Sequence, residues 1–241
     1  MKLARMPDGS PEIFHTLQGE GRHTGRPSIF IRSSLCNLSC RWCDTPYTWN
    51  WEGTSFAHDG EQKFNRDEQI IDLSTQEIVN EVGQYPCSNY VFTGGEPLIQ
   101  EKDWVRLMDK LSGSFEIETN GTLFPKEDFL SRIHQLNVSP KLSNSGVPEE
   151  QRYQPEVLRQ LAETEKADFK FVIADQKDFA EVESLSAASK LPADRIFLMP
   201  KAISVSELEA NQSFVASLAQ ENGMNYSDRL HLRLFGSGRG V

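Results

Sequence analysis

The sequence has few cysteines and no long apolar run. It contains 4 cysteines in 241 residues, too few for the disulfide framework that stabilises small secreted domains. No apolar stretch approaches the roughly 18 to 20 residues that a membrane-spanning helix needs. The first residues lack the apolar core of a secretory signal. We therefore expect a cytoplasmic protein that keeps its thiols reduced and makes no membrane contact.

Basic residues are also scarce relative to acidic ones. The chain has 25 Lys and Arg against 35 Asp and Glu, a formal net charge of −10, and its pI is about 5.1. Broad contact with a nucleic-acid backbone requires clustered Lys and Arg. This charge argues against direct nucleic-acid contact and favours a small-molecule substrate.

No internal repeat, low-complexity tract or flexible linker divides the sequence, so we expect residues 1–241 to form one domain. One stretch departs from regular patterning. Residues 49–73 are polar and irregular, and a segment of this length inside a compact domain is either a functional loop or a solvated insertion. Both interpretations, a cover over a site and an insertion without catalytic importance, are compatible with the sequence.

Segments typical of strands alternate with segments typical of helices. The candidate strands are Ser28–Arg32, Tyr90–Thr93, Phe115–Thr119, Asn137–Ser139, Asp168–Ile173, Ile196–Met199 and Leu230–Phe235. The candidate helices are Thr75–Tyr85, Lys102–Leu111, Glu156–Glu165, Phe179–Lys190 and a helix after Ser204 that continues to about Gln220.

This alternation predicts an α/β fold with βαβ units and a mostly parallel sheet. A closed barrel of eight such units typically needs about 250 residues. The repeats here fall short of eight, so we expect an incomplete, open TIM-like (β/α) barrel. Its chemistry should lie at the carboxyl ends of the strands.

Three of the cysteines form a tight C-x3-C-x2-C loop at Cys36, Cys40 and Cys43. Thiolates at such spacings can converge on an iron-sulfur cluster, and three of them leave one iron without a protein ligand. A zinc site completed by Cys87, or thiols without any ligand, are the alternatives. Because Cys87 precedes the candidate strand at Tyr90, we expect it at the opposite end of the sheet.

The cysteine loop, with an aromatic residue at Trp42, resembles the signature of the radical S-adenosylmethionine (SAM) superfamily. The resemblance implies an open barrel of the radical SAM type and a 4Fe-4S cluster whose free iron binds SAM. It also implies that the reduced cluster cleaves SAM to methionine and a 5′-deoxyadenosyl radical. In such enzymes the cofactor carries the difficult chemistry, while the protein orients it and excludes water and oxygen.

Three further motifs follow candidate strands: Thr93-Gly-Gly-Glu-Pro97, Glu118-Thr-Asn-Gly-Thr122 and Ser139-Pro-Lys141. Taken singly, the first two are also compatible with ordinary turns. Placed after successive strands, they match superfamily motifs that contact SAM. The resemblance assigns SAM contacts to Trp42, Asp44, Gly95, Glu96, Glu118, Ser139, Pro140 and Lys141.

The amino-terminal segment from Phe14 to Gly21, with Arg32 shortly after it, narrows the resemblance. Gln18 and Glu20 can hydrogen-bond to a heterocycle, and Arg32 can hold a carboxylate with two parallel bonds. Together with Cys-Asp-Thr at residues 43–45, this pattern is similar to the 7-carboxy-7-deazaguanine synthase family. Members of that family contract the ring of 6-carboxy-5,6,7,8-tetrahydropterin with loss of ammonia, regenerate SAM, and feed the synthesis of queuosine and related 7-deazapurines.

Several residue roles are implied by this resemblance alone. Thr45 would bind Mg²⁺, for which hydroxyl and carboxylate oxygens are suitable ligands. Substrate contacts are assigned to Leu17, Gln18, Gly19, Glu20, Arg32, Thr93, His231 and Val241. The family also implies a homodimer and a low-potential electron donor such as flavodoxin or ferredoxin.

Two other functions remain compatible with parts of the sequence. An activating enzyme that abstracts hydrogen from a glycine of a protein partner would share the cysteine loop, but Arg32 and the segment Leu17–Gly21 favour a small substrate. A metal-stabilised interaction domain would leave the Thr93–Pro97 motif unexplained.

Overall fold

The computed structural model describes all residues, 1–241, and its strands and helices alternate along most of the chain. The strands are β1 (Lys2–Ala4), β2 (Ile13–Leu17), β3 (Pro27–Ser33), β4 (Ile70–Asp72), β5 (Asn89–Gly94), β6 (Ser114–Thr119), β7 (Gln135–Val138), β8 (Ala167–Ile173), β9 (Ile196–Pro200) and β10 (Asn225–Tyr226). The α-helices are α1 (Arg66–Gln69), α2 (Thr75–Val82), α3 (Glu101–Met108), α4 (Glu127–Leu130), α5 (Glu149–Arg152), α6 (Pro155–Glu163), α7 (Gln176–Ser189), α8 (Val205–Glu221) and α9 (Leu230–Phe235). Short 3-10 turns η1 (Pro46–Thr48), η2 (Pro97–Gln100), η3 (Ser143–Ser145) and η4 (Ala193–Arg195) connect them.

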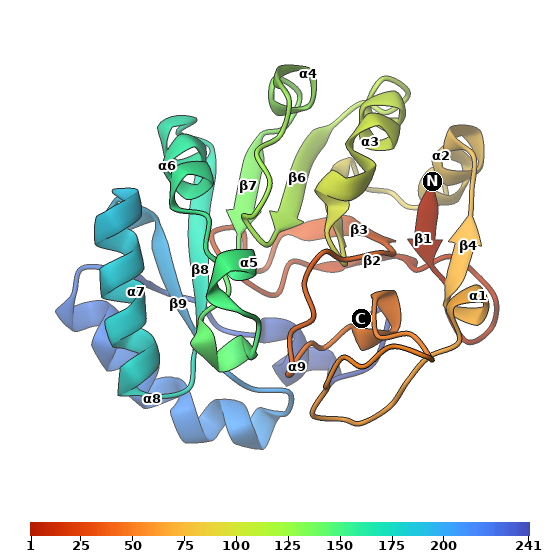
Figure 1. Ribbon diagram of the computed structural model, residues 1–241. Coiled ribbons are helices and arrows are strands. Elements are labelled where there is room, and N and C mark those ends of the chain that lie inside the picture. Colours follow the sequence, from red (N-terminus) through yellow and green to blue (C-terminus); the bar gives the residue numbers. More distant parts are fainter.

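All strands belong to one ten-stranded sheet in the order β10-β9-β8-β7-β6-β5-β3-β1-β4, with β2 paired to β3. β3 and β5 to β10 run parallel, whereas β1, β2 and β4 are antiparallel additions that the sequence pattern did not reveal. The two end strands of this order, β10 and β4, do not pair, so the sheet stays open. The expected incomplete TIM-like barrel is confirmed, and Figure 1 shows helices α3, α4, α6 and α7 arranged outside the curved sheet.

Alternation along the strands separates an apolar outer face from a polar inner face. Phe115 and Ile117 of β6 belong to a core cluster of 35 buried residues that joins the sheet to the helices. The alternate residues of the same strand, Glu116 and Glu118, face the opposite side because side chains alternate along a strand. Lys170 of β8 likewise stands between core phenylalanines. The inner face therefore collects charged groups that the core excludes.

Local sequence signals fix several helix starts. Ser74 and Glu77 form a reciprocal capping box at α2, which satisfies backbone N–H groups that have no helical partner. At α8 the Ser204 side chain accepts from the Glu207 amide. Glu207 does not return that bond, because its carboxylate accepts instead from the Ile203 amide. No helix of the structure combines the length and the apolar character needed to cross a membrane.

The predicted strand Leu230–Phe235 is wrong, because these residues form helix α9. Their alternating leucines would place three apolar side chains on one face of a strand, which requires a sheet edge to pair with. The chain instead leaves β10 and crosses to the β2–β3 loop, where the Leu230 amide donates to the Gly19 carbonyl at 2.9 Å. Only Leu232 of the helix is buried. The pattern of these six residues is ambiguous, and tertiary contacts therefore determined their secondary structure.

Residues 49–73 are less irregular than the sequence indicates. The end of the segment forms α1 and then β4, which pairs antiparallel with β1. Its first part folds back on itself, since Trp51 and Phe64 form an isolated bridge and the Phe64 amide donates to the Asn50 carbonyl at 3.1 Å. The segment is thus a folded connection that links the cysteine loop to the edge strand of the sheet.

Trp104 provides a test of the outer core. It is fully buried, stacks on Phe92 with ring centroids 4.4 Å apart, and donates its indole N–H to the Pro97 carbonyl at 2.9 Å. We expect Trp104→Ala to lower the free energy of unfolding by about 3 to 5 kcal/mol, because it leaves a large cavity. The matched control Phe124→Ala, at a side chain that is 42% exposed, should cost less than about 1 kcal/mol. Equal losses in denaturant titrations would contradict this assignment of the core.

Candidate functional site

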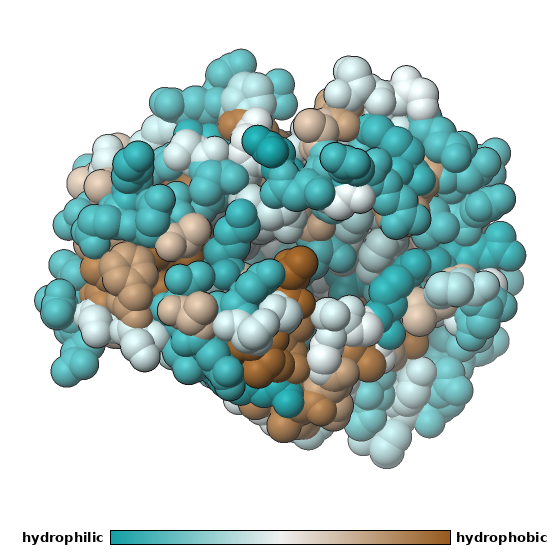
Figure 2. All heavy atoms as spheres, turned by 90° about the horizontal axis from the view of Figure 1, so that it is seen from below, coloured by the Kyte–Doolittle hydropathy of each residue, from teal (hydrophilic) through white to brown (hydrophobic).

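A cavity of about 720 Å³ opens at the carboxyl ends of the parallel strands. Figure 2 shows the molecule from this end, with apolar side chains gathered beside a hollow in a mostly hydrophilic surface. The cavity wall includes residues from the cysteine loop, the strand ends, the β2–β3 loop and α9. Of the residues assigned in the sequence analysis, it contains Leu17, Gln18, Gly19, Glu20, Arg32, Cys36, Cys40, Trp42, Cys43, Asp44, Thr45, Thr93, Gly95, Glu118, Ser139, Lys141, His231 and Val241. Glu96 and Pro140 are not on this wall.

The three clustered cysteines face the cavity from the loop after β3. Burial raises the pKa of Cys36 to about 12 and that of Cys40 to about 11, and it also raises the pKa of Cys43. Thiols of this kind stay protonated until a positively charged partner stabilises the thiolate, which a metal centre does. Three thiols on one concave surface therefore fit an iron-sulfur cluster held by three ligands.

The zinc alternative finds no support in the geometry. Zinc needs its four ligand atoms within about 2.0 to 2.3 Å of one point, so this alternative requires Cys87 beside the three clustered cysteines. Cys87 lies just before β5, at the other end of the sheet, where its thiol contacts the Pro27 carbonyl at 3.4 Å. It does not line the cavity.

Two adjacent glycines allow the turn after β5 to contact the cysteine loop directly. Gly94 has a φ of +124°, and a Cβ added there would lie 2.0 Å from the Ser33 carbonyl oxygen. A Cβ on Gly95 would lie equally close, 2.0 Å, to the Leu35 carbonyl oxygen. Any side chain at either position would displace the loop that carries Cys36.

Glu96 braces this turn rather than lining the cavity. It is fully buried. Its two oxygens accept hydrogen bonds from the Thr119 hydroxyl at 2.9 Å and from the Asn120 backbone N–H at 2.8 Å. It also accepts from the Leu98 amide at 3.1 Å. Burial raises its pKa, although these hydrogen bonds oppose the shift. The carboxylate thus joins the end of β5 to the end of β6, and its predicted contact with SAM stays a prediction.

Trp42, Lys141 and Ser139 contact one another on the cavity wall. The Trp42 indole donates to the Asn144 carbonyl at 2.9 Å, which fixes the ring. The Lys141 ammonium lies 5.6 Å from the centroid of this ring and donates to the Ser139 hydroxyl at 2.9 Å. A cation held over an aromatic face in this way remains available to an anionic ligand.

A chain of charged groups crosses the opposite part of the cavity. Glu20 forms ion pairs with Lys170 and, at 2.9 Å, with Arg229. Arg229 also contacts the Asp44 carboxylate at 2.7 Å. Burial alone would raise the pKa of Glu20 and of Asp44, but the neighbouring cations outweigh burial and lower both values. Both carboxylates are therefore ionised at neutral pH.

Lys170 and Arg229 are functional candidates that the sequence analysis missed. Lys170 had a detectable signal, since a lysine flanked by buried phenylalanines in a strand must point to the inner face. No sequence signal pointed to Arg229, because its proximity to Glu20 and Asp44 depends on the path that the chain takes after β10. Both line the cavity.

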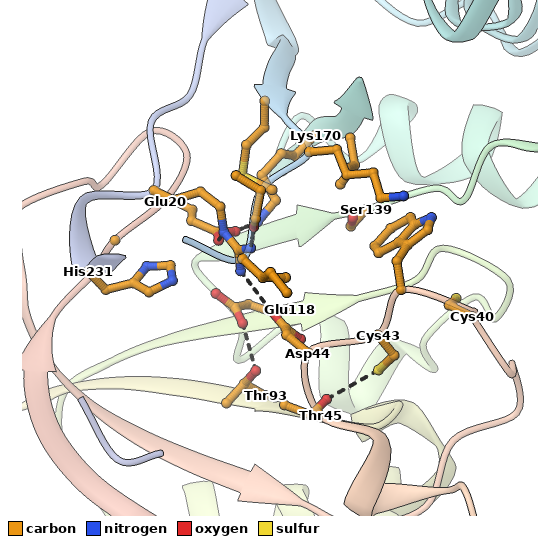
Figure 3. Close-up of a pocket in the computed structure, with 18 of the residues that line it drawn as sticks. Glu20, Cys40, Cys43, Asp44, Thr45, Thr93, Glu118, Ser139, Lys170 and His231 are labelled. Atoms are coloured by element: carbon orange, nitrogen blue, oxygen red, sulfur yellow. Dashed lines mark hydrogen bonds and ion pairs between the residues drawn. The ribbon is translucent and has the colours of Figure 1, made fainter. Parts of the chain in front are cut away.

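The end of β3 presents Arg32 beside Thr93, its register partner on β5. The Arg32 Nε donates to the buried Glu12 carboxylate at 2.8 Å. Thr93 donates to Glu118 at 2.6 Å, and the Gln18 amide donates to the other oxygen of the same carboxylate at 3.3 Å. Figure 3 shows Thr93 and Glu118 joined in this way. These side chains form one polar face from three strand ends.

His231 reaches the cavity from helix α9, not from a strand. A Cβ on Gly19 would lie 2.2 Å from its Nδ1 atom, so the glycine makes room for the ring. Burial lowers the pKa of His231, so the ring is neutral at physiological pH. A neutral imidazole can both donate and accept a hydrogen bond.

Thr45 occupies the N-cap position of η1 but makes no capping bond with its side chain. Its hydroxyl instead lies 3.6 Å from the Cys43 sulfur and lines the cavity. A threonine at an N-cap position commonly uses its hydroxyl to cap the turn. The hydroxyl thus contacts Cys43 and lies on the cavity wall beside the cysteine loop.

Comparisons with known proteins agree with this geometry. The sequence model of the radical SAM superfamily matches residues 30–172. A protein of Halobacterium salinarum named 7-carboxy-7-deazaguanine synthase is 34% identical, covering 93% of this chain and 89% of its own length. The protein of that name from Pyrobaculum aerophilum is 34% identical, covering 95% of both chains. The crystal structure of QueE from Escherichia coli aligns with a TM-score of 0.66 at 26% identity, covering 96% of this chain and 95% of that one. The chain therefore belongs to the radical SAM superfamily and, within it, to the 7-carboxy-7-deazaguanine synthase family.

Proposed function

We propose that this protein converts 6-carboxy-5,6,7,8-tetrahydropterin to 7-carboxy-7-deazaguanine with loss of ammonia, in the route to queuosine and related 7-deazapurines. The observation that carries the proposal is the placement of Arg32 in the same cavity as the three cysteines. A radical SAM cavity with a guanidinium fixed at a strand end is suited to a small carboxylated substrate. The relatives that are named 7-carboxy-7-deazaguanine synthase support the same product.

The family implies a 4Fe-4S cluster and SAM, and the cavity offers groups for both. Cys36, Cys40 and Cys43 would hold three irons and leave the fourth for the amino and carboxylate groups of SAM. When bound, the cluster supplies the electron that splits SAM and so makes hydrogen-atom abstraction from the substrate possible. The wall formed by Trp42, Lys141 and Ser139, with Asp44, Gly95 and Glu118, would bind SAM beside the cluster.

Arg32 would hold the substrate carboxylate. Its Nε is committed to Glu12 at 2.8 Å, which fixes the plane of the guanidinium and leaves its two terminal nitrogens for a second carboxylate. Bonds of this parallel kind are strong and directional. Burying the substrate charge there is compensated by the guanidinium, which remains protonated under all ordinary conditions.

The pterin ring would lie between Gln18 and Thr93 on one side and the Glu20–Lys170 pair on the other. Carboxylates accept hydrogen bonds from ring and amino N–H groups, while the Gln18 amide can also donate. The neutral His231 would close the face from α9. These groups would offer both donors and acceptors to the polar edges of a pterin.

Magnesium is part of the proposal at Thr45, with Asp44 next to it. Mg²⁺ prefers oxygen ligands and takes few from the protein. Asp44 is paired with Arg229 at 2.7 Å, so a cation near Asp44 would compete with this arginine. The proposal also includes a cytoplasmic location, which was expected from the sequence composition. The homodimer and flavodoxin or ferredoxin as electron donor derive from the family resemblance.

The reaction can be tested with the reconstituted holoenzyme. Incubation under anaerobic conditions with SAM, reductant, Mg²⁺ and the carboxytetrahydropterin should give 7-carboxy-7-deazaguanine, identified by mass spectrometry. An intact cluster that cleaves SAM without forming a deazaguanine would refute the substrate while leaving the superfamily chemistry in place.

The ligand set can be tested with a matched pair of cysteine variants. Cys43→Ala should abolish both iron retention and turnover, because only two thiolates would remain. Cys87→Ala should leave the iron content and the rate unchanged, since this thiol lies at the other end of the sheet. Loss of iron in both variants would restore the four-cysteine alternative.

The carboxylate role of Arg32 predicts a selective binding defect. Arg32→Ala should raise KM for the pterin by roughly 10- to 150-fold, the range expected for losing hydrogen bonds between charged groups. The dissociation constant of SAM should stay within about twofold. Arg32→Lys should recover little, because an ammonium cannot reproduce the two parallel bonds. Equal losses in pterin and SAM binding would contradict the assignment.

A further inference from the structure

The segment after η1 makes contacts with the cysteine loop that the proposed reaction does not explain. Trp49, His58, Asp59 and Gly60 line the cavity together with the three cysteines. Asp59 and Gly60 are exposed on their other side, while His58 is half-buried. Residues 54–63, here named the cluster strap, thus lie between solvent and the cysteine loop. In Figure 1 they belong to the orange loop below the label C.

The cluster strap binds the backbone of the cysteine loop on both sides of Trp42. The His58 Nε2 atom lies 2.8 Å from the Cys43 carbonyl oxygen. The Asp59 amide donates to the Arg41 carbonyl at 2.8 Å, and the Arg41 side chain returns an ion pair to Asp59 at 3.0 Å. Two carbonyls of the Cys40–Cys43 interval are therefore held by neighbouring residues of the strap.

The direction of the His58 bond follows from its other ring nitrogen. The Gly60 amide donates to Nδ1 at 3.0 Å, so Nδ1 is an acceptor and the ring proton belongs on Nε2. Nε2 therefore donates to the Cys43 carbonyl. Trp49 packs edge-on against the same ring, with centroids 6.2 Å apart at 65°, which restricts its rotation.

The strap is itself held closed from within. The Lys63 ammonium donates to the Asn50 side-chain oxygen at 2.7 Å, to the Thr54 hydroxyl at 3.2 Å and to the Phe56 carbonyl at 2.6 Å. Three acceptors satisfy all three ammonium protons. This lysine joins the two ends of the strap at a distance from the cysteine loop, so it can be varied separately from His58.

We infer that His58 is a positioning residue that fastens the strap over the Cys43 side of the iron-sulfur cluster and limits the access of oxygen and water to it. The inference rests on the proposed cluster site. The protein environment of such a cluster controls its exposure to solvent. A loop fixed at the Cys43 carbonyl on one side and closed by Lys63 on the other provides this cover.

The test measures the stability of the cluster in air rather than turnover. Each protein is reconstituted anaerobically, transferred to air-saturated buffer, and followed by loss of the visible absorbance of the cluster and by released iron. His58→Ala should lose its cluster about fivefold faster than the original protein, the change in open population expected for losing one average hydrogen bond. His58→Gln, which keeps an N–H donor, should restore most of the protection.

Two further variants separate the strap from a general loss of stability. Lys63→Ala should also accelerate loss of the cluster, because it opens the strap without touching the cysteine loop. His15→Ala, at an exposed histidine of β2, is the matched control and should decay at the original rate. A His58→Ala or Lys63→Ala protein that keeps its cluster as long as the original would overturn the inference, as would equal decay of His58→Ala and His58→Gln.

The same experiment distinguishes an error in the proposed cluster site from an error in the proposed role of the strap. If the original protein binds no iron after reconstitution, the proposed cluster site is wrong and the strap has nothing to cover. If the original protein holds its cluster and the strap variants behave identically to it, only the role of the strap is refuted.

Discussion

At Gly94 and Gly95 the turn after β5 and the loop after β3 lie in direct backbone contact. The Gly95 amide donates to the Ser33 carbonyl at 3.1 Å and the Glu96 amide to the Leu35 carbonyl at 2.8 Å. A Cβ at either glycine would lie 2.0 Å from a carbonyl oxygen of the facing loop. Because Glu96 then reaches the end of β6, this contact sets the position of the first cysteine relative to three strand ends. The geometry of the cavity depends on it.

The second constraint on the cavity is electrostatic. Glu20, Asp44, Lys170 and Arg229 come from four separate segments and form one chain of ion pairs inside the cavity. Glu20, Lys170 and Arg229 are largely buried, whereas the Asp44 side chain is 57% exposed. Removing one of the buried members leaves an uncompensated charge, which costs more than the pair itself contributes. The chain connects the side of the cavity assigned to substrate with Asp44, which directly follows the last clustered cysteine.

Several features followed from the sequence because each depends on neighbouring residues. The alternation of apolar strands with helical segments gave the open barrel, and Ser74 with Glu77 gave a helix start that the structure reproduces. The spacing of Cys36, Cys40 and Cys43 indicated one loop with three thiols. Motifs directly after parallel strands had to meet at one edge of the sheet, which is why so many of the assigned residues line one cavity.

Tertiary structure alone decided the rest, because those features depend on contacts between distant segments. The sequence pattern of Leu230–Phe235 is typical of a strand, yet these residues form a helix where the chain contacts the Gly19 carbonyl. No local pattern brings Arg229 to Asp44 or His58 to the Cys43 carbonyl. The sequence by itself determined the superfamily chemistry and the edge of the sheet at which it occurs. Which charges compensate one another there, and what covers the cysteines, was determined by packing of segments that carry no signal of their proximity.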